Sequence, residues 1–572
     1  MQDGTRWAAP TRKPVGLVLV GMCLSLALAA CGGSDDKSSD STKKSADKAA
    51  GGSSGGGVGK KGGKITVLGS SFPDYLDPGL SYTVDGWQAL TQVYPGLLTF
   101  PHKPGQAGAE VVPGLAEDMP KVSNGNKTFL FTLRDGLTYS DASPIKASDY
   151  ANVVKRALEQ DSQGAGFYLP IDGAEKFLKD KKGEISGIKT DDAARTIEIT
   201  LTKPRGAFLY ELAVPFGGMV PGDTAAKNLT SSPPPGAGRY MIKDVKVNRG
   251  YTLVKNPNFS KSLEGTAVDS GNLDEIVHQV DRSLANEATK ITQNQADFMI
   301  DIPPADRIPE IKQRAANRYH EFPTNSTFYF FMNSEVPPFD DLKVRQAVNY
   351  AIDIKAINRI QANVLTPANT TLPPGVAGYE KTPDLYPFDL EKAKALIKEA
   401  GAEGAAVTVW GNPEDPTKPT IEYYTDVLNS IGLKAKSKII SAETYFATIG
   451  NRKTKAQTGW ANWFQDYPHP SNFIDVLVNP NKVVESGNNN YSYNAADKEL
   501  GAKIDKLNAE PELTDDVKKQ WAAVDKEIQQ KAYWGIYGNR KQTTFMSERM
   551  DFENCKGESV LVNHDWSQFC LK

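Results

Sequence analysis

The 572-residue sequence has few of the features that mark catalytic or metal-binding proteins. It contains five histidines, none at metal-ligand spacing from another: His102, His278, His320, His469 and His564. A His-Glu-x-x-His motif and a Walker loop are both missing, and no nucleophile is marked by a neighbouring base. We therefore expect a protein that is not an enzyme and that requires no cofactor or metal.

Long apolar runs and basic blocks are also scarce. After Cys31 no apolar run approaches about 18 residues, the length that a membrane-spanning helix needs. The formal charge at pH 7 is −3, and no basic block occurs outside the low-complexity residues 32–63. This distribution argues against nucleic acid as a partner.

The first 30 residues have the pattern of a bacterial lipoprotein signal. Three cations precede an uncharged, mostly apolar run, residues 15–30, which ends in Leu-Ala-Ala directly before Cys31. Cleavage before Cys31 would leave this cysteine to carry lipid and to anchor the protein in the membrane. The alternative is a plain secretory signal in which the cysteine is incidental.

Residues 31–63 are predicted to form a tether. After Cys31 they are almost all Gly, Ser, Lys, Asp, Thr and Ala, with Val58 the one large apolar side chain. Such a segment cannot bury enough apolar surface to offset its chain entropy, so we expect it to be disordered. A coil of this length reaches roughly 30 Å, which suits a leash between membrane and domain.

Of the four cysteines, Cys23 lies in the signal and Cys31 is the lipid site, which leaves Cys555 and Cys570. Disulfides persist outside the cytoplasm, and a bond here closes a loop of about 15 residues, which contributes on the order of 3 kcal/mol. We expect this disulfide, and two unpaired buried thiols are the alternative. The pair has no nearby His or Cys with which to build a zinc site.

The order of elements predicts an α/β protein. Residues 64–68 read as a short strand at the start of the globular part. Farther on, a strand at 407–410, a helix at 421–431 and a strand at 433–440 follow one another with short links, which predicts a parallel pair with a crossover helix. A helix at 343–352 buries apolar residues at helical spacing.

The stretch GWANWFQDYPHPSNFIDVL, which begins at Gly459, is the most informative part of the chain. It places two tryptophans, Trp460 and Trp463, close to one carboxylate, Asp466, and to an Asp-Tyr-Pro turn. Aromatic faces beside a single anchored negative charge suit a pocket that holds an organic cation.

Several motifs resemble, in order and spacing, those of the family 5 extracellular solute-binding proteins, the oligopeptide- and dipeptide-binding components of ABC importers. They are Leu-Asp-Pro at 76–78, the FTLRDGL run with its following helix at 131–158, the PPF and VRQAVNYAI segments at 337–352, and Gly-Trp…Asp-Tyr-x-x-Pro at 459–470. The resemblance covers about residues 64–545. It implies a bilobed periplasmic-binding-protein fold of class II, with three sub-domains and two crossing hinge strands.

In that fold we expect lobe 1 to comprise residues 64–319, with a sub-domain of roughly 99–228 inserted. Lobe 2 would comprise residues 320–534. The chain would return to lobe 1 over residues 535–572, where the disulfide fastens its end.

The resemblance also implies the binding residues. The family's aspartate, which takes the α-ammonium of a bound peptide, matches Asp466, and the aromatic residue before it matches Trp463. The alternative for Asp466 is that it caps the turn at Tyr467-Pro468. Trp460 and Tyr467 are further candidates for ligand contact, although either could be core. His469, where the family commonly has aspartate, is expected in a surface loop; it could instead alter the pH response or the ligand preference.

The function that the resemblance implies is a lipid-anchored, monomeric protein on the extracytoplasmic side of the cell membrane. It would capture oligopeptides between two closing lobes and deliver them to an ABC permease. A sensor of a signalling peptide is an alternative, and so is a binder of a nickel complex, haem or a sugar. No residue can be assigned to the carboxylate of the peptide.

Overall fold

Two large mixed sheets, each assembled from distant parts of the chain, organise the residues that the computed structural model describes, 59–160, 162–414 and 416–572. The predicted signal, Cys31 and nearly all of the predicted tether lie outside these described residues.

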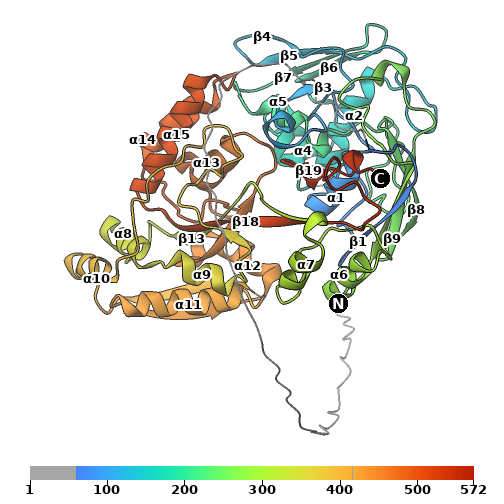
Figure 1. The fold of residues 1–572 in the computed structure, drawn as a ribbon. Coiled ribbons are helices and arrows are strands. Elements are labelled where there is room, and N and C mark those ends of the chain that lie inside the picture. Colours follow the sequence, from blue (N-terminus) through green and yellow to red (C-terminus); the bar gives the residue numbers. More distant parts are fainter. Residues whose placement is uncertain (1–58, 161, 415) are drawn as a thin grey trace, which may run out of the picture. The chain divides into compact units, whose positions relative to one another are not determined.

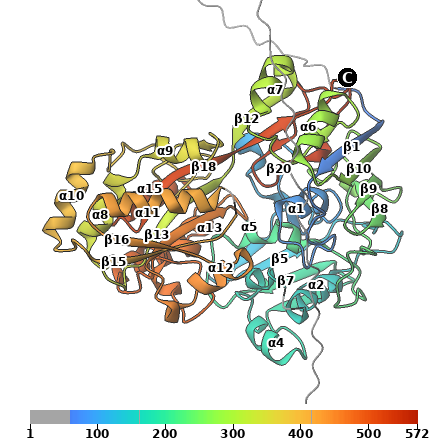
Figure 2. The same cartoon turned by 90° about the horizontal axis from the view of Figure 1, so that it is seen from below.

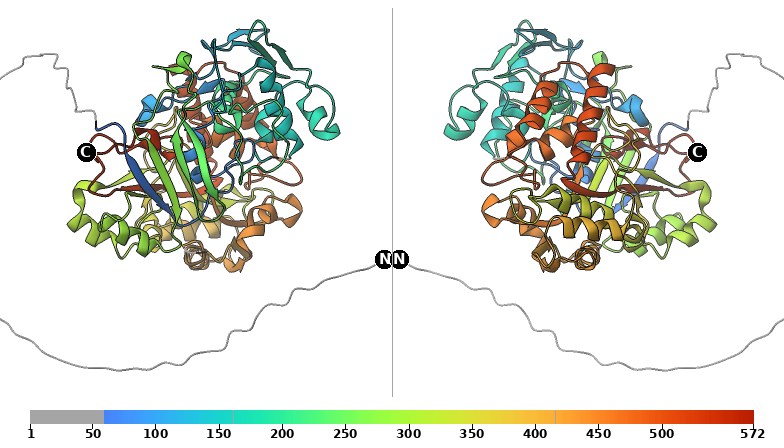
Figure 3. Two further views of the ribbon diagram at one scale, coloured as in Figure 1. Left: turned by 90° about the vertical axis from the view of Figure 1, so that its right-hand side faces the viewer. Right: turned by 90° about the vertical axis from the view of Figure 1, so that its left-hand side faces the viewer.

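The first sheet has five strands in the order β11-β1-β10-β9-β8. Their bounds are β1 Lys64–Gly69, β8 Tyr240–Lys246, β9 Gly250–Lys255, β10 Glu275–Val280 and β11 Phe298–Met299. Strand β1 runs parallel to β10 and β11, whereas β9 is antiparallel to both of its neighbours, β8 and β10. The left view of Figure 3 shows blue β1 beside the green strands. The strand predicted at 64–68 is thereby confirmed.

A smaller antiparallel sheet, in the order β4-β5-β7-β6, lies between β1 and β8 in the sequence. Its strands are β4 Lys121–Ser123, β5 Thr128–Thr132, β6 Ile188–Asp191 and β7 Thr196–Thr200. Helix α2 (Ala147–Glu159) contacts this sheet and buries Tyr150, Val154 and Leu158 completely. The other elements before residue 300 are α1 Val84–Leu90, β2 Leu98–Thr99, β3 Val112–Pro113, α3 Ala165–Tyr168, α4 Ala174–Asp180, α5 Phe208–Leu212 and α6 Leu284–Thr292.

The second sheet has seven strands, six of them in the order β12-β18-β13-β17-β15-β16. They are β12 Tyr319–Pro323, β13 Ser326–Met332, β15 Ala406–Gly411, β16 Lys434–Ile439, β17 Thr458–Phe464 and β18 Trp534–Phe545, and β14 Leu365–Thr366 pairs with β18. Strands β15 and β16 are parallel and are joined through α11 (Thr417–Ser430), as the sequence predicts.

Helices accompany this second sheet. They are α8 Leu342–Ala351, α9 Ile354–Ile360, α10 Leu390–Glu399, α12 Ala442–Ile449, α13 Ser471–Val478, α14 Lys498–Asn508 and α15 Asp515–Gln530; α7 Ile308–Arg314 precedes the sheet. Figure 1 shows α8, α9, α10 and α11 gathered together, and the right view of Figure 3 shows α14 and α15 side by side. Helix α8 begins after Asp341, whose side chain accepts the backbone N–H of Lys343, so the predicted helix at 343–352 is confirmed.

The buried apolar side chains form two main cores. The first core extends from Ile65 to Ile300 and includes residues from Met546 to Phe569, while the second core extends from Phe328 to Tyr537. The long strand β18 pairs with β13 at its start and with β12 at its end, and Figure 2 shows it reaching from one part of the fold to the other. Strands β12, β13 and β18 therefore lie where the sequence predicts that the chain crosses between lobes; the lobe boundaries themselves stay a prediction.

The end of the chain is fastened to the first core. The sulfurs of Cys555 and Cys570 are bonded, with 5.6 Å between the Cα atoms, and Trp566 and Phe569 are fully buried. The short strands β19 (Glu558–Ser559) and β20 (Asn563–His564) form a hairpin inside the disulfide loop. Among the described residues, no helix combines the length and apolarity that crossing a membrane requires.

Candidate functional site

The site begins where β17 ends. This strand lies between β13 and β15 in the second sheet and stops at Phe464. Pro468 and Pro470 lie between the end of this strand and the start of α13 at Ser471, and neither has the backbone N–H that a strand would need there. Asp466 therefore lies in the short turn between a central strand and a helix.

Asn472, in the first turn of α13, fixes the position of this aspartate. Its side-chain amide donates to Oδ2 of Asp466 at 2.8 Å, and its carbonyl oxygen accepts the backbone N–H of Asp466 at 2.9 Å. The same oxygen accepts the indole N–H of Trp463 at 3.1 Å. One fully buried amide thus orients the predicted anchor and the predicted aromatic neighbour together.

A second partner comes from the other core. The hydroxyl of Tyr82, two residues before α1, donates to Oδ1 of Asp466 at 2.9 Å, although the two residues are 384 positions apart. Burial, together with the charge of Asp466, raises the pKa of Tyr82 far above its usual value, so the hydroxyl remains a donor. Sequence reasoning missed Tyr82 and Asn472. Tyr82 lies in no distinctive motif, whereas Asn472 lies in the informative stretch that begins at Gly459, two residues after the Pro-His-Pro segment.

The environment of Asp466 changes its acidity. Burial raises the pKa of this carboxyl to about 6, because desolvation penalises the charged form; the bonds from Asn472 and Tyr82 oppose the shift, and the charge of Glu211 adds to it. At neutral pH the group is mainly ionised and carries a negative charge in a half-buried position.

A cavity of about 340 Å³ lies against Asp466. Its walls combine residues from both cores: Tyr82, Thr83, Val84 and Trp87 at the start of α1, Phe446 on α12, Asn462 to Asp466 at the end of β17, and Asn489, Tyr491 and Leu561 from loops. Trp463 is half-buried in this wall, as expected for a residue that faces a ligand. The volume is within the range of about 300–1,000 Å³ typical of ligand sites.

Two other predicted contacts lie outside this lining. Trp460 is buried in the second core. The centre of its ring lies 5.7 Å from the centre of the ring of Phe446, so Trp460 packs behind a residue that lines the cavity. Tyr467 is buried in the first core, although it follows β17, and its hydroxyl donates to Glu211 at 3.1 Å. Tyr467 therefore joins the two cores, and whether either residue also touches a ligand stays a prediction.

The prediction of a surface histidine at position 469 is wrong. His469 is 2% exposed, its ring lies 5.1 Å from that of Tyr210, and its Nδ1 contacts the hydroxyl of Ser471 at 2.7 Å. Burial, with the nearby charge of Arg205, lowers the pKa of His469 to about 3, so the ring is neutral. The proline-flanked turn packs inward between the cores instead of facing solvent.

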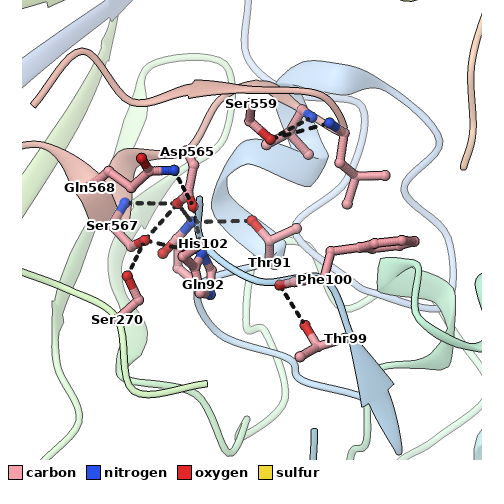
Figure 4. Close-up of polar contacts among 12 residues, drawn as sticks. Thr91, Gln92, Thr99, Phe100, His102, Ser270, Ser559, Asp565, Ser567 and Gln568 are labelled. Carbon is pink, nitrogen blue, oxygen red and sulfur yellow. Dashed lines mark hydrogen bonds and ion pairs between the residues drawn. The ribbon is translucent and has the colours of Figure 1, made fainter. Parts of the chain in front are cut away.

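A second polar cluster contains serine, histidine and aspartate but does not have the geometry of a nucleophilic triad (Figure 4). In His102, the Nδ1 atom contacts both Asp565 (2.5 Å) and Ser567 (3.1 Å). A catalytic serine bonds to the ring nitrogen opposite the one that the aspartate holds. This cluster instead fastens the C-terminal segment to the loop after β2.

Among the described residues, side chains of the types that bind metals come together at one place, where Asp551 lies near Cys555 and Cys570. Both sulfurs of this group are bonded to each other, so they are not thiolates that could bind a metal.

Comparison with known proteins gives consistent matches. The family model for the middle part of the bacterial extracellular solute-binding proteins, family 5, matches residues 110–484. The dipeptide-binding protein of Escherichia coli K12 is 27% identical over 385 residues, which cover 64% of this chain and 70% of that protein. Heme-binding protein A of Haemophilus influenzae is 26% identical over 456 residues, which cover 77% and 80%.

Solved structures share the fold. The clavulanic acid biosynthesis oligopeptide binding protein 2 superimposes with a TM-score of 0.80 and 22% identity, covering 90% of this chain and 96% of that one. The Haemophilus influenzae OppA complex with the peptide RPPGFSPFR gives a TM-score of 0.66 at 17% identity, with coverage of 90% and 99%. These likenesses confirm the predicted α/β periplasmic-binding-protein fold. Since the family model spans more than half of the sequence, the chain belongs to family 5 of the bacterial extracellular solute-binding proteins.

Proposed function

We propose that this protein captures oligopeptides between its two lobes and delivers them to the permease of an ABC importer, without transforming them. The observation that carries the proposal is the ionised, half-buried Asp466 at the wall of an aromatic cavity. Relatives named for dipeptide and oligopeptide binding support a peptide as the ligand.

In this proposal Asp466 accepts the α-ammonium group of the peptide. A charge-assisted hydrogen bond of this kind contributes about 1.5–3 kcal/mol. Trp463 borders the same cavity and offers its ring to the ligand, while Asn472 keeps both side chains in place. Main-chain hydrogen bonds to the peptide would be independent of its side chains.

Capture requires the lobes to close over the ligand. Periplasmic binding proteins close by a hinge motion, and the closed form excludes water and so strengthens each polar contact. Strands β12, β13 and β18 connect the two cores and are the proposed hinge. The bond from Tyr82 to Asp466 and the bond from Tyr467 to Glu211 both join the predicted lobe 1 to the predicted lobe 2 and would form on closure.

We further propose that the protein is a monomer held at the outer face of the cell membrane by lipid on Cys31. The support is the sequence pattern before this cysteine and the family's extracellular role. A Cys31→Ser variant should leave the membrane fraction and appear in the soluble fraction. If this variant stays in the membrane fraction although its signal has been removed, the anchor is not the lipid on Cys31.

The first experiment is to denature the purified protein and identify by mass spectrometry what it releases. A ladder of mixed peptides would support a nutritional uptake role, and a single defined peptide would point to a sensor. A haem, sugar or metal chelate, with peptides failing to raise Tm, would overturn the proposal.

Two variants test the anchor. Asp466→Asn keeps the shape of the side chain but removes its charge, and it should abolish peptide retention. Asp426→Asn is the matched control, because Asp426 is an exposed aspartate on α11 of the same lobe and should leave retention unchanged. Equal retention by both variants would exclude Asp466 as the anchor.

A further inference from the structure

The lining of the cavity beside Asp466 has an uneven chemistry. Among the described residues that line it, Asp466 is the one charged side chain. Six lining residues are aromatic: Tyr82, Trp87, Phe446, Trp463, Phe464 and Tyr491. The cavity therefore offers one negative charge and a large apolar surface, and its described lining offers no cation to a ligand.

Asp466 still has room for a ligand donor. An ionised carboxylate accepts about four hydrogen bonds, two at each oxygen. Tyr82 uses one position on Oδ1, and Asn472 uses one on Oδ2. The remaining positions suit the N–H groups of an ammonium ion.

A ligand carboxylate has no such partner here. A carboxylate buried in this aromatic cavity would lose its hydration without gaining an ion pair, which is costly. An acidic side chain would also be repelled by Asp466. The carboxyl end of the ligand must therefore lie outside the cavity, which a single amino acid cannot achieve because its two charges are adjacent.

We infer that this cavity receives the ammonium end of a peptide whose first side chain is large and apolar, and that it discriminates against acidic first residues and free amino acids. The inference rests on the proposed function and narrows its substrate class. The volume of about 340 Å³ is at the small end for ligand sites, which fits one end of a peptide better than a whole long ligand.

Phe446 is the lining residue best suited to a test. It is 38% exposed on α12, so truncation removes cavity wall without opening the core. Its ring packs against those of Trp460 and Tyr491 at 5.7 and 6.1 Å. Phe388 is the matched control, since it is 54% exposed and lines a different cavity of the same lobe.

The experiment is isothermal titration of the ligand-stripped protein at pH 7.5 with three tripeptides, Phe-Ala-Ala, Ala-Ala-Ala and Asp-Ala-Ala, and with free phenylalanine. Burial of a phenyl side chain should make Phe-Ala-Ala bind about 10- to 100-fold more tightly than Ala-Ala-Ala. Asp-Ala-Ala should bind more weakly than Ala-Ala-Ala, and free phenylalanine more weakly still. Phe446→Ala should reduce the ratio between Phe-Ala-Ala and Ala-Ala-Ala, while Phe388→Ala should preserve it.

The outcomes separate this inference from the proposed function. If all three tripeptides bind with equal affinity, or if Asp-Ala-Ala matches Phe-Ala-Ala, the inference is wrong and peptide capture stands. If none of the tripeptides binds, the inference fails, and peptide capture fails with it only if denaturation of the purified protein also releases no peptide. An unchanged ratio in Phe446→Ala would also overturn the inference, because the apolar wall would then not select the first side chain.

Discussion

Asp466 and Asp565 both bond to residues several hundred positions away in the sequence, but their surroundings differ. Asp565 is buried and has five polar contacts, from the side chains of Gln92, His102 and Gln568 and from both the backbone N–H and the hydroxyl of Ser567. Asp466 receives two side-chain donors and borders a cavity. The protein fills the acceptor positions of the Asp565 carboxylate, whereas the Asp466 carboxylate keeps some of its acceptor positions free.

The acidity of the two groups follows this difference. Burial by itself would raise the pKa of Asp565, but the charge and hydrogen bond of His102, with bonds from Ser567 and Gln568, hold it well below its usual value. At Asp466 burial prevails and the pKa rises to about 6. A carboxylate whose acceptor positions are all filled by the protein holds two segments together. A carboxylate beside a cavity with free acceptor positions can bind a ligand donor.

The largest expected effect is the loss of stability when the charge of Asp565 is removed. Asp565→Asn removes the negative charge that faces the buried His102, and breaking a buried pair costs about 3–5 kcal/mol. Urea unfolding at pH 7 should show this loss. Glu198→Gln, at the exposed pair with Lys189, is the control and should cost less than about 1 kcal/mol. Equal stability of the two variants would mean that the pair of Asp565 and His102 does not stabilise the fold.

The disulfide should contribute nearly as much to the same segment. The loop that Cys555 and Cys570 close spans 15 positions and contains Asp565. Replacing both cysteines by serine should lower the free energy of unfolding by about 3 kcal/mol, as a lowered Tm would report. The reductant dithiothreitol should lower the Tm of the natural protein and leave the double variant unchanged. If the disulfide of the natural protein has been reduced and its Tm is the same as without dithiothreitol, this expectation is wrong.

At Asp466 the expected effect is on binding, and it depends on pH. An acid whose pKa is raised to about 6 takes up its proton as the pH falls through 6, and the neutral form cannot pair with an ammonium ion. The Kd of a peptide should therefore rise about tenfold per pH unit below 6 and stay nearly constant between pH 6.5 and 7.5. Titrations from pH 4.5 to 7.5 test this. Asp466→Asn should bind weakly with no such dependence, and a flat profile for the natural protein would exclude ionised Asp466 as the anchor.

Local patterns predicted much of the fold because they depend on neighbours in the sequence. The helix between β15 and β16 and the strand β1 follow from apolar spacing and short links. Asp466 and Trp463 were found together because they share one stretch, and the structure places both at the same cavity.

The missed parts of the site depend on tertiary contacts. Tyr82 meets Asp466 only because β18 and its neighbours bring the two cores together, and nothing in the sequence around Tyr82 indicates this. His469 is expected at the surface because it lies in a loop, and most loop residues face solvent. Its burial depends on Tyr210, which lies more than 250 positions away.

The smallest effect concerns the bond from Tyr82, which gives Asp466 its one donor from the other core. If this bond forms on closure of the lobes, as proposed, its loss should weaken the closed, ligand-bound state and leave the open state unaffected. Tyr82→Phe keeps the ring in the cavity wall and should raise the Kd of a peptide about 2- to 10-fold. With one donor fewer, the pKa of Asp466 should also rise, so the acid limb of the binding profile should move to higher pH.

Tyr75→Phe, at a tyrosine close by in the sequence but outside the cavity lining, is the control and should leave both the Kd and the pH profile unchanged. If Tyr82→Phe binds peptide as tightly as the natural protein, with an unshifted profile, the contact across the cavity contributes nothing to closure, and the pKa of Asp466 is set by burial, Asn472 and the charge of Glu211.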